Sequence, residues 1–153
     1  MALADYLRPA TVCMDMQTGN RKDLIHRMLQ LLVEDGQLAA KLLKKAEKAI
    51  LDREKLGSTA IGRGIAVPHA RLAALDRVMM AFGHCPEGVE FHALDGAPVH
   101  DVFLVMGPPD SSEEYVSVLQ HISELVQNED FRRFLAQTEA STAVIELIDE
   151  MDP

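Results

Sequence analysis

The amino-acid sequence predicts an α/β sandwich in which helices flank a mixed β-sheet. The chain has 153 residues, the length of one domain, and is 48% hydrophobic and 25% charged, as globular proteins are. Segments with helical periodicity stand before and after a series of short apolar, β-branched runs. With no tryptophan and 5% aromatic residues, the core must be largely aliphatic. We therefore expect residues 1–153 to form a single domain.

Two helices are expected in the first half of the chain. Asn20 can cap a helix that continues to about Asp35, where Gly36 ends it. A second helix is expected from about Leu38 to Glu54. The apolar residues of the first helix recur at helical spacing: Leu24, Ile25, Met28, Leu29 and Leu32.

Short strands are expected in the middle of the chain, over residues 65–67, 78–82 and 99–106, with one more near 89–91. The last third is expected to be helical. One helix should start at Ser112, a short one at Asp130, and a final one should be capped by Ser141.

The net charge of −9 argues against a nucleic-acid partner, and it is unevenly distributed. Residues 1–77 contain 13 Lys and Arg against 9 Asp and Glu, whereas residues 78–153 contain 2 against 15. We therefore expect any anionic ligand to bind to the first half. Cys13 and Cys85 have no metal-ligand spacing, no cofactor motif is present, and no apolar run could span a membrane. With no signal-like N-terminus either, these features predict a cytoplasmic protein without a bound metal or cofactor.

The glycine-rich segment 58–69 is the strongest candidate for a functional site. Gly62 and Gly64 permit positive φ angles, and the successive N–H groups of such a loop can bind an anion. Ser58 and Thr59 supply hydroxyl donors, and Arg53 is a cation suited to phosphate oxygens.

His69 follows Pro68 at the end of this segment. A histidine beside an anion-binding loop is a nucleophile that can accept and return a phosphoryl group. The residues alone leave a structural role for His69 open, because an isolated Gly-x-Gly is a weak signal. The loop is neither a P-loop nor a complete dinucleotide fingerprint.

Residues 53–71, R-E-K-L-G-S-T-A-I-G-R-G-I-A-V-P-H-A-R, closely resemble the active-site signature of the enzyme IIA domains of the bacterial phosphoenolpyruvate:sugar phosphotransferase system. The resemblance is to the fructose/mannitol class, especially its nitrogen-regulatory branch. It implies a three-layer α/β/α sandwich in which His69 is the phosphorylated histidine and Arg53 is the active-site arginine. It also implies a phosphocarrier protein (of the HPr or NPr kind) as donor, and a regulatory target or a membrane sugar permease as recipient.

The sequence departs from that family at Tyr115, where many members have a second histidine. A tyrosine can donate one hydrogen bond to a phosphoryl oxygen but cannot supply a cation. We include Tyr115 with Ser58, Thr59, Gly62 and Gly64 as a candidate phosphate-binding residue.

Three functions remain open at this point. The favoured one is a phosphotransferase-system IIA protein that carries phosphohistidine in nitrogen or carbon regulation, since no permease segment or second domain is present. The second is a soluble IIA subunit of a fructose-type sugar permease. The third is a non-catalytic module that keeps the fold and binds an anion or a partner, which the Tyr115 departure keeps open.

Overall fold

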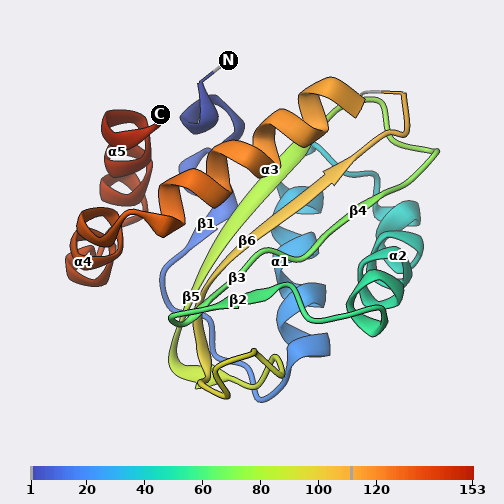
Figure 1. Ribbon diagram of the computed structural model, residues 1–153. Coiled ribbons are helices and arrows are strands. Elements are labelled where there is room, and N and C mark those ends of the chain that lie inside the picture. The colour runs from blue at the N-terminus through green and yellow to red at the C-terminus, as the bar shows by residue number, and fades with distance from the viewer. Residues whose placement is uncertain (1, 111) are drawn as a thin grey trace.

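The computed structural model describes residues 2–110 and 112–153, which form a three-layer α/β/α sandwich (Figure 1). Its mixed sheet has the strand order β1-β5-β6-β3-β2, and β4 also pairs with β6. The two long strands β5 (Met79–Val89) and β6 (Val99–Gly107) are antiparallel neighbours at the centre. Both β1 (Val12–Cys13) and β3 (Ile65–Ala66) run parallel to a central strand, and β2 (Ala60–Gly62) pairs antiparallel with β3. The sequence-based prediction of a mixed sheet is confirmed.

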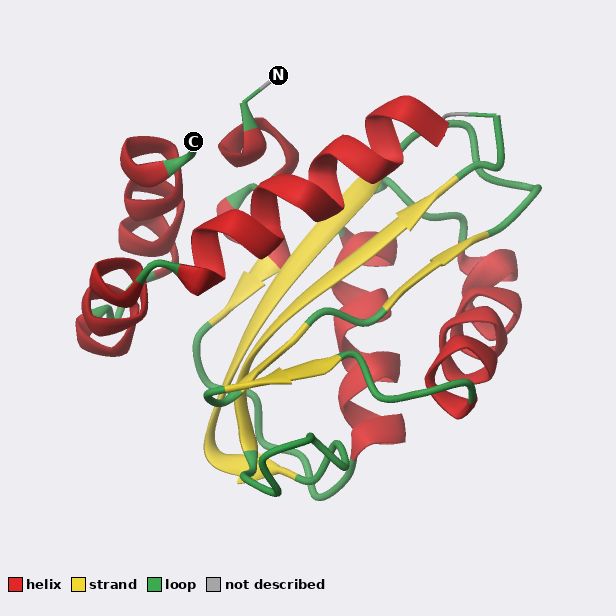
Figure 2. Ribbon diagram, in the orientation of Figure 1, coloured by secondary structure: helices red, strands yellow, loops and turns green. Residues whose placement is uncertain are grey.

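Helices cover both faces of the sheet (Figure 2). One face carries α1 (Arg21–Glu34) and α2 (Leu43–Lys55), and the other carries α3 (Ser112–Gln127). Next to α3 lie α4 (Glu129–Gln137) and α5 (Ser141–Met151). Short 3-10 turns, η1 (Leu3–Tyr6), η2 (Pro9–Thr11) and η3 (Ala40–Leu42), complete the chain.

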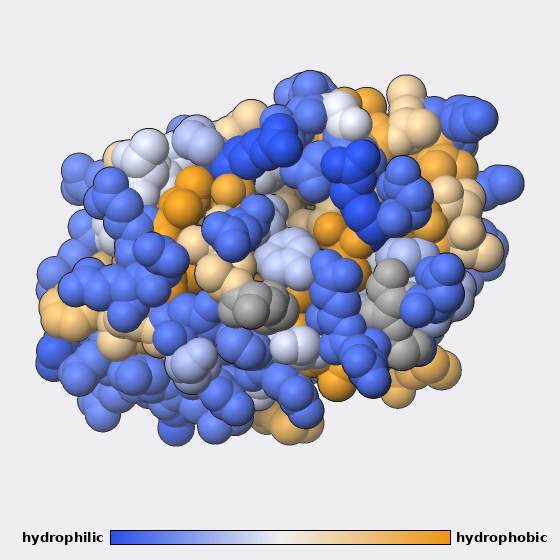
Figure 3. Space-filling model, turned by 90° about the horizontal axis from the view of Figure 1, so that it is seen from above, coloured by the Kyte–Doolittle hydropathy of each residue, from blue (hydrophilic) through white to orange (hydrophobic). Residues whose placement is uncertain are grey.

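The side chains of β6 alternate between two cores, one on each face of the sheet. Leu104 and Met106 pack in the core under α1 and α2, while Phe103 and Val105 pack in the core under α3, α4 and α5. On the face seen in Figure 3, hydrophilic side chains dominate, and apolar ones reach the surface only in patches between them.

Several predicted elements differ in extent from those observed. The strand expected over 78–82 runs from Met79 to Val89, so the short strand expected near 89–91 is not a separate element and contributes only Val89. The observed strand passes through Pro86, which the sheet accommodates because the β5–β6 register is irregular between His84 and Val89. The second helix begins at Leu43, after the turn η3, instead of at Leu38.

The predicted helix caps were partly right. The Asn20 side chain accepts a hydrogen bond from the N–H of Asp23, as a cap should. Ser141 is the first residue of α5, and the preceding residue, Ala140, caps the helix without a side-chain hydrogen bond.

The position of β4 (His69–Arg71) determines which way His69 faces. His69 is paired with Val105 of β6, and Arg71 with Gly107. Ala70, between them, packs in the core beneath α1 and α2. Because neighbouring strand residues point to opposite faces, His69 and Arg71 point toward α3.

Within residues 2–110 and 112–153, no helix is both long and apolar enough to cross a membrane.

Candidate functional site

A cavity of about 230 Å³ lies beside His69, between the sheet, the end of α2 and α3. It brings together four of the residues that the sequence singled out. Residues from three separate parts of the chain line it: Arg53, Ser58, Thr59, Ile61, Val67, His69, Leu119 and Ser123.

The hydrogen bond of His69 fixes its tautomer. Nδ1 lies 2.7 Å from the backbone oxygen of Val67, and since a carbonyl oxygen only accepts, Nδ1 carries the proton. Burial, followed by the positive charge of Arg53, lowers the pKa of His69 below its ordinary value of 6.5. The Val67 hydrogen bond and the negative charge of Glu54 oppose this shift. His69 is therefore neutral near pH 7, with its lone pair on Nε2.

Arg53 supplies a positive charge to the same cavity. It lies in the last turn of α2, and its guanidinium donates a 2.9 Å hydrogen bond to the backbone oxygen of Gly57. In the described part of the chain, no carboxylate forms an ion pair with it. Its remaining donors are free to bind an anion.

Glu54, which the sequence analysis did not single out as a site residue, attaches the segment after α2 to the helix. Its buried carboxylate accepts hydrogen bonds from the backbone N–H and the hydroxyl of Thr59, and it lies 3.3 Å from the guanidinium of Arg21. Glu54 directly follows Arg53 in the motif. Because it binds Thr59, it sets the position of one wall of the cavity.

The hydroxyls of Ser58 and Thr59 line the cavity but already have partners. Ser58 donates to the backbone oxygen of Phe91 and accepts from the N–H of Ala60 at 3.1 Å. Thr59 donates to Glu54. These hydroxyls hold the wall of the cavity in shape, and a ligand would have to compete for them.

Gly62 and Gly64 are not among the residues that line this cavity. They form the turn between β2 and β3, where both have positive φ angles of 93° and 79°. The N–H of Arg63 between them donates to the carboxylate of Asp95 at 2.9 Å. Because that N–H already binds an acidic side chain of the protein, we leave both glycines out of the proposed phosphate site.

Tyr115 lies next to His69. The two ring centroids are 6.2 Å apart, and the tyrosine is only 4% exposed. The Arg71 guanidinium lies over the Tyr115 ring, 4.8 Å from its centroid. Burial raises the pKa of Tyr115 to about 12, so its hydroxyl keeps its proton at neutral pH.

Gly107 allows this close packing. A Cβ atom at Gly107 would lie 2.9 Å from Cδ1 of Tyr115, a distance that real Cβ atoms essentially never show. Any larger residue would push the ring away from the strand.

Two cavity residues on α3, Leu119 and Ser123, were missed in the sequence analysis. They follow Tyr115 by one and two steps of four residues, which places all three on one side of the helix. The helical period starting at Tyr115 was therefore the signal that could have found them.

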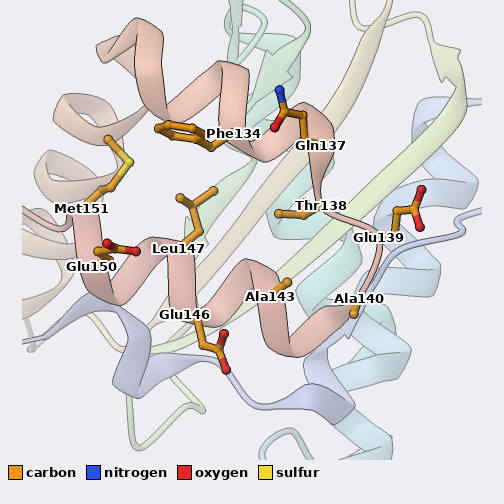
Figure 4. A pocket seen from close by; sticks show the side chains of 10 residues that line it. All are labelled: Phe134, Gln137, Thr138, Glu139, Ala140, Ala143, Glu146, Leu147, Glu150 and Met151. Carbon is orange, nitrogen blue, oxygen red and sulfur yellow. The ribbon is translucent and has the colours of Figure 1, made fainter.

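The other histidines lie apart from this cavity. Nδ1 of His84 lies 2.8 Å from Asp101, and Nδ1 of His100 lies 2.9 Å from the backbone oxygen of Cys85. Among the described residues there is no group of three or more potential ligands that could hold a metal ion. The largest cavity, between α4 and α5, contains neither histidine nor cysteine (Figure 4).

Comparisons with known proteins agree with this architecture. Residues 5–151 match the family model described as "Phosphoenolpyruvate-dependent sugar phosphotransferase system, EIIA 2". The chain is 32% identical over 152 residues to the fructose-specific EIIABC component of Bacillus subtilis, matching 99% of this chain but only 24% of that protein. It is 28% identical to a nitrogen regulatory protein of Bradyrhizobium diazoefficiens, matching 97% of this chain and 95% of that one.

Among solved structures, the nitrogen regulatory protein IIA-Ntr of Neisseria meningitidis superposes with a TM-score of 0.87 at 28% identity. The match covers 95% of this chain and 98% of that one. Because the family model covers nearly the whole chain, this protein belongs to the EIIA 2 family of the phosphoenolpyruvate-dependent sugar phosphotransferase system.

Proposed function

We propose that this protein carries a phosphoryl group on Nε2 of His69, within the phosphoryl-carrying role of its family. The observation that supports this most directly is the hydrogen bond from Nδ1 of His69 to Val67. It leaves Nε2 as the nitrogen with a lone pair, in a cavity that also contains the Arg53 guanidinium. A neutral imidazole needs no external base to attack phosphorus.

The proposed step is an in-line transfer between two histidines. Nε2 of His69 attacks the phosphorus of a donor phosphohistidine, the new P–N bond forms, and the old one breaks with its electron pair returning to the donor ring. The proton stays on Nδ1, and its hydrogen bond to the backbone oxygen of Val67 stabilises the positive charge that develops on the His69 ring. Arg53 binds the phosphoryl oxygens, because its planar guanidinium offers paired donors.

Domains of this family take phosphoryl groups from upstream carriers and pass them to EIIB partners. For this chain we propose a phosphocarrier protein as the donor. We also propose that the protein acts in the cytoplasm, because the relay starts from phosphoenolpyruvate.

We favour a nitrogen-regulatory role over sugar transport. The nitrogen regulatory protein IIA-Ntr superposes on this chain with a TM-score of 0.87, whereas the mannitol IIA structure of Escherichia coli superposes with a TM-score of 0.76. The alternative, a IIA unit of a fructose permease, is supported by the higher identity to the Bacillus subtilis protein, although this chain spans about a quarter of that protein's length. A non-catalytic binding module is the third alternative, and it predicts that His69 is never phosphorylated.

Incubation with phosphoenolpyruvate and the general carrier proteins, followed by intact-mass measurement, tests the proposal. The chain should gain one phosphoryl group that is labile in acid and stable in base, and His69→Ala should gain none. His92→Ala, which changes an exposed histidine, is the matched control and should be labelled as the parent is. NMR of the imidazole nitrogens should place the phosphorus on Nε2. Labelling of His69→Ala, or phosphorus on Nδ1, contradicts the assignment.

A further inference from the structure

The groove between α4 and α5 is the largest cavity described, at about 890 Å³ (Figure 4). It lies on the other side of α3 from β4 and shares no lining residue with the cavity beside His69. Apolar side chains from both helices face it. Phe134 of α4 is 43% exposed, and Leu147 and Met151 of α5 are half-buried.

These apolar residues are only partly covered by the rest of the protein. On α5, Val144 and Ile148 are fully buried in the core, on a helix that packs against η1, η2 and α4. Ala143, Leu147 and Met151, spaced four residues apart, form a second apolar stripe beside them. On α4, Phe131 is buried, whereas Phe134, three residues later, points into the groove. Leu147 and Met151 pack against the edge of the core and stay partly exposed, so the apolar face of each helix reaches the surface at the groove.

Carboxylates surround this apolar floor. Glu146 and Glu150 follow one another along α5 at a spacing of four residues, and Glu139 lies between the two helices. In the part of the chain that the structure describes, none of the three pairs with a cation. Arg133 of α4 stacks on Phe134 but is itself paired with Asp130, so it leaves the rim acidic.

We propose that this α4–α5 groove binds a basic amphipathic helix of a protein partner. Apolar side chains of such a helix would fill the space over Phe134 and Leu147, as amphipathic helices fill hydrophobic grooves elsewhere. Its lysines or arginines would lie along the edge and pair with Glu146 and Glu150. An acidic helix would bring like charges together at this edge, so charge selects a basic occupant. The groove shares no lining residue with the cavity beside His69, so we expect a docked partner to leave the phosphoryl site open.

A defined probe tests the proposal on the whole chain. The probe is a synthetic helical peptide built of leucine and lysine, with leucine at positions i, i+3, i+4 and i+7. We expect it to bind and to shift the backbone amide resonances of α4 and α5. The same peptide with glutamate in place of lysine should bind at least about tenfold more weakly.

Two variants locate the interaction. Glu146→Lys combined with Glu150→Lys should weaken binding of the leucine–lysine peptide by about tenfold or more. Glu34→Lys combined with Glu87→Lys makes the same change in net charge at exposed positions outside the groove, and should leave binding within about twofold. Phe134→Ser, at a surface position, should weaken binding without unfolding the protein.

Other outcomes would overturn the proposal. One is equal weakening by both charge-reversed pairs, which would mean that the peptide responds only to net charge. Another is a set of resonance shifts outside α4 and α5. A third is a dimer in sedimentation that Phe134→Ser dissociates, since the groove would then be filled by a second copy of this chain.

Discussion

Two hollows on the α3 side of the sheet differ in size, in charge and in what they can hold. The cavity beside His69 is about 230 Å³ and contains the Arg53 guanidinium, whereas the α4–α5 groove is about 890 Å³ and is edged by glutamates. Over residues 2–110 and 112–153, neither the guanidinium nor these glutamates form an ion pair. A small cationic cavity suits a phosphoryl group, and a wide apolar groove suits a polypeptide. The uneven charge of the sequence thus corresponds to two sites of different chemistry.

The two hollows are also built differently. Hydrogen bonds fix the cavity: Val67 holds His69, Glu54 holds Thr59, and Gly57 holds Arg53. The groove is shaped by the packing of two helices. A site for group transfer needs atoms held in place, while a docking surface needs area and matching charge.

Of the substitutions that test this comparison, the one with the largest expected effect changes Arg53, the cation in the small cavity. Arg53→Lys should slow phosphoryl transfer to His69 by about tenfold or more, on the scale of about 1.4 kcal/mol per decade, because lysine cannot make paired hydrogen bonds to phosphoryl oxygens. The melting temperature should change by only a few degrees, since half-buried Arg53 has no ion-pair partner among the described residues.

Rapid-quench measurement of phosphorylation checks this rate. Arg27→Lys, the same substitution at an exposed ion pair on α1, should leave the rate unchanged. An unchanged rate for Arg53→Lys would remove the guanidinium from the proposed phosphate site.

A smaller effect is expected at Tyr115. Tyr115→His restores the arrangement common in the family, and it should speed onward transfer more than acceptance. A second imidazole can become cationic and stabilise the charge that develops as the phosphoryl group leaves. The lifetime of isolated phosphorylated protein mixed with a recipient domain reports the onward step.

Tyr115→Phe serves as the companion variant because it keeps the ring that packs on Gly107 and Arg71. If Tyr115→His and Tyr115→Phe have the same lifetimes as the parent, Tyr115 only fills space beside His69.

The smallest effect concerns the protonation of His69. The pKa of His69 is lowered first by burial and second by Arg53, so Arg53→Gln should raise it only part of the way to 6.5. The sign for stability follows from the same shift. As the pH falls below about 6.5, the unfolded chain binds a proton at this position before the folded protein does, so stability decreases.

NMR titration of the His69 ring measures this pKa directly. Arg27→Gln, which removes a cation from α1, should leave it unchanged. A fall in the His69 pKa on removal of Arg53 would contradict the proposed electrostatic contact.

The sequence predicted the fold best where local patterns were strong. The cap at Asn20, the periodicity of α1 and the apolar run of β6 all appear in the structure. It missed β1, β2 and β4, which have only two or three residues, whereas the equally short β3 was found through the apolar run at 65–67. These short strands form through pairing of β1 with β5, of β2 with β3 and of β4 with β6, which local sequence does not reveal.

One contiguous motif carried the prediction of the candidate site, and the functional roles of its residues stay predictions. Residues 53–71 identified His69 and Arg53, and the structure places both at one cavity. The assignment of Gly62 and Gly64 to phosphate binding stays without support from the structure, because Asp95, more than thirty residues later, binds the N–H between them. Such a long-range contact has no local signal.

The sequence by itself determined the class of fold, the family signature and the uneven distribution of charge, because these depend on residue identity and short-range spacing. Only the tertiary structure decided which nitrogen of His69 is free, that Tyr115 packs between His69 and Arg71, and that α4 and α5 leave an open groove. The Tyr115 contacts join segments that are more than forty residues apart, whereas the hydrogen bond of His69 to Val67 and the groove between two consecutive helices depend on the exact local backbone geometry and helix packing. Strand pairing and helix packing bring those segments together, and no local pattern records their distances.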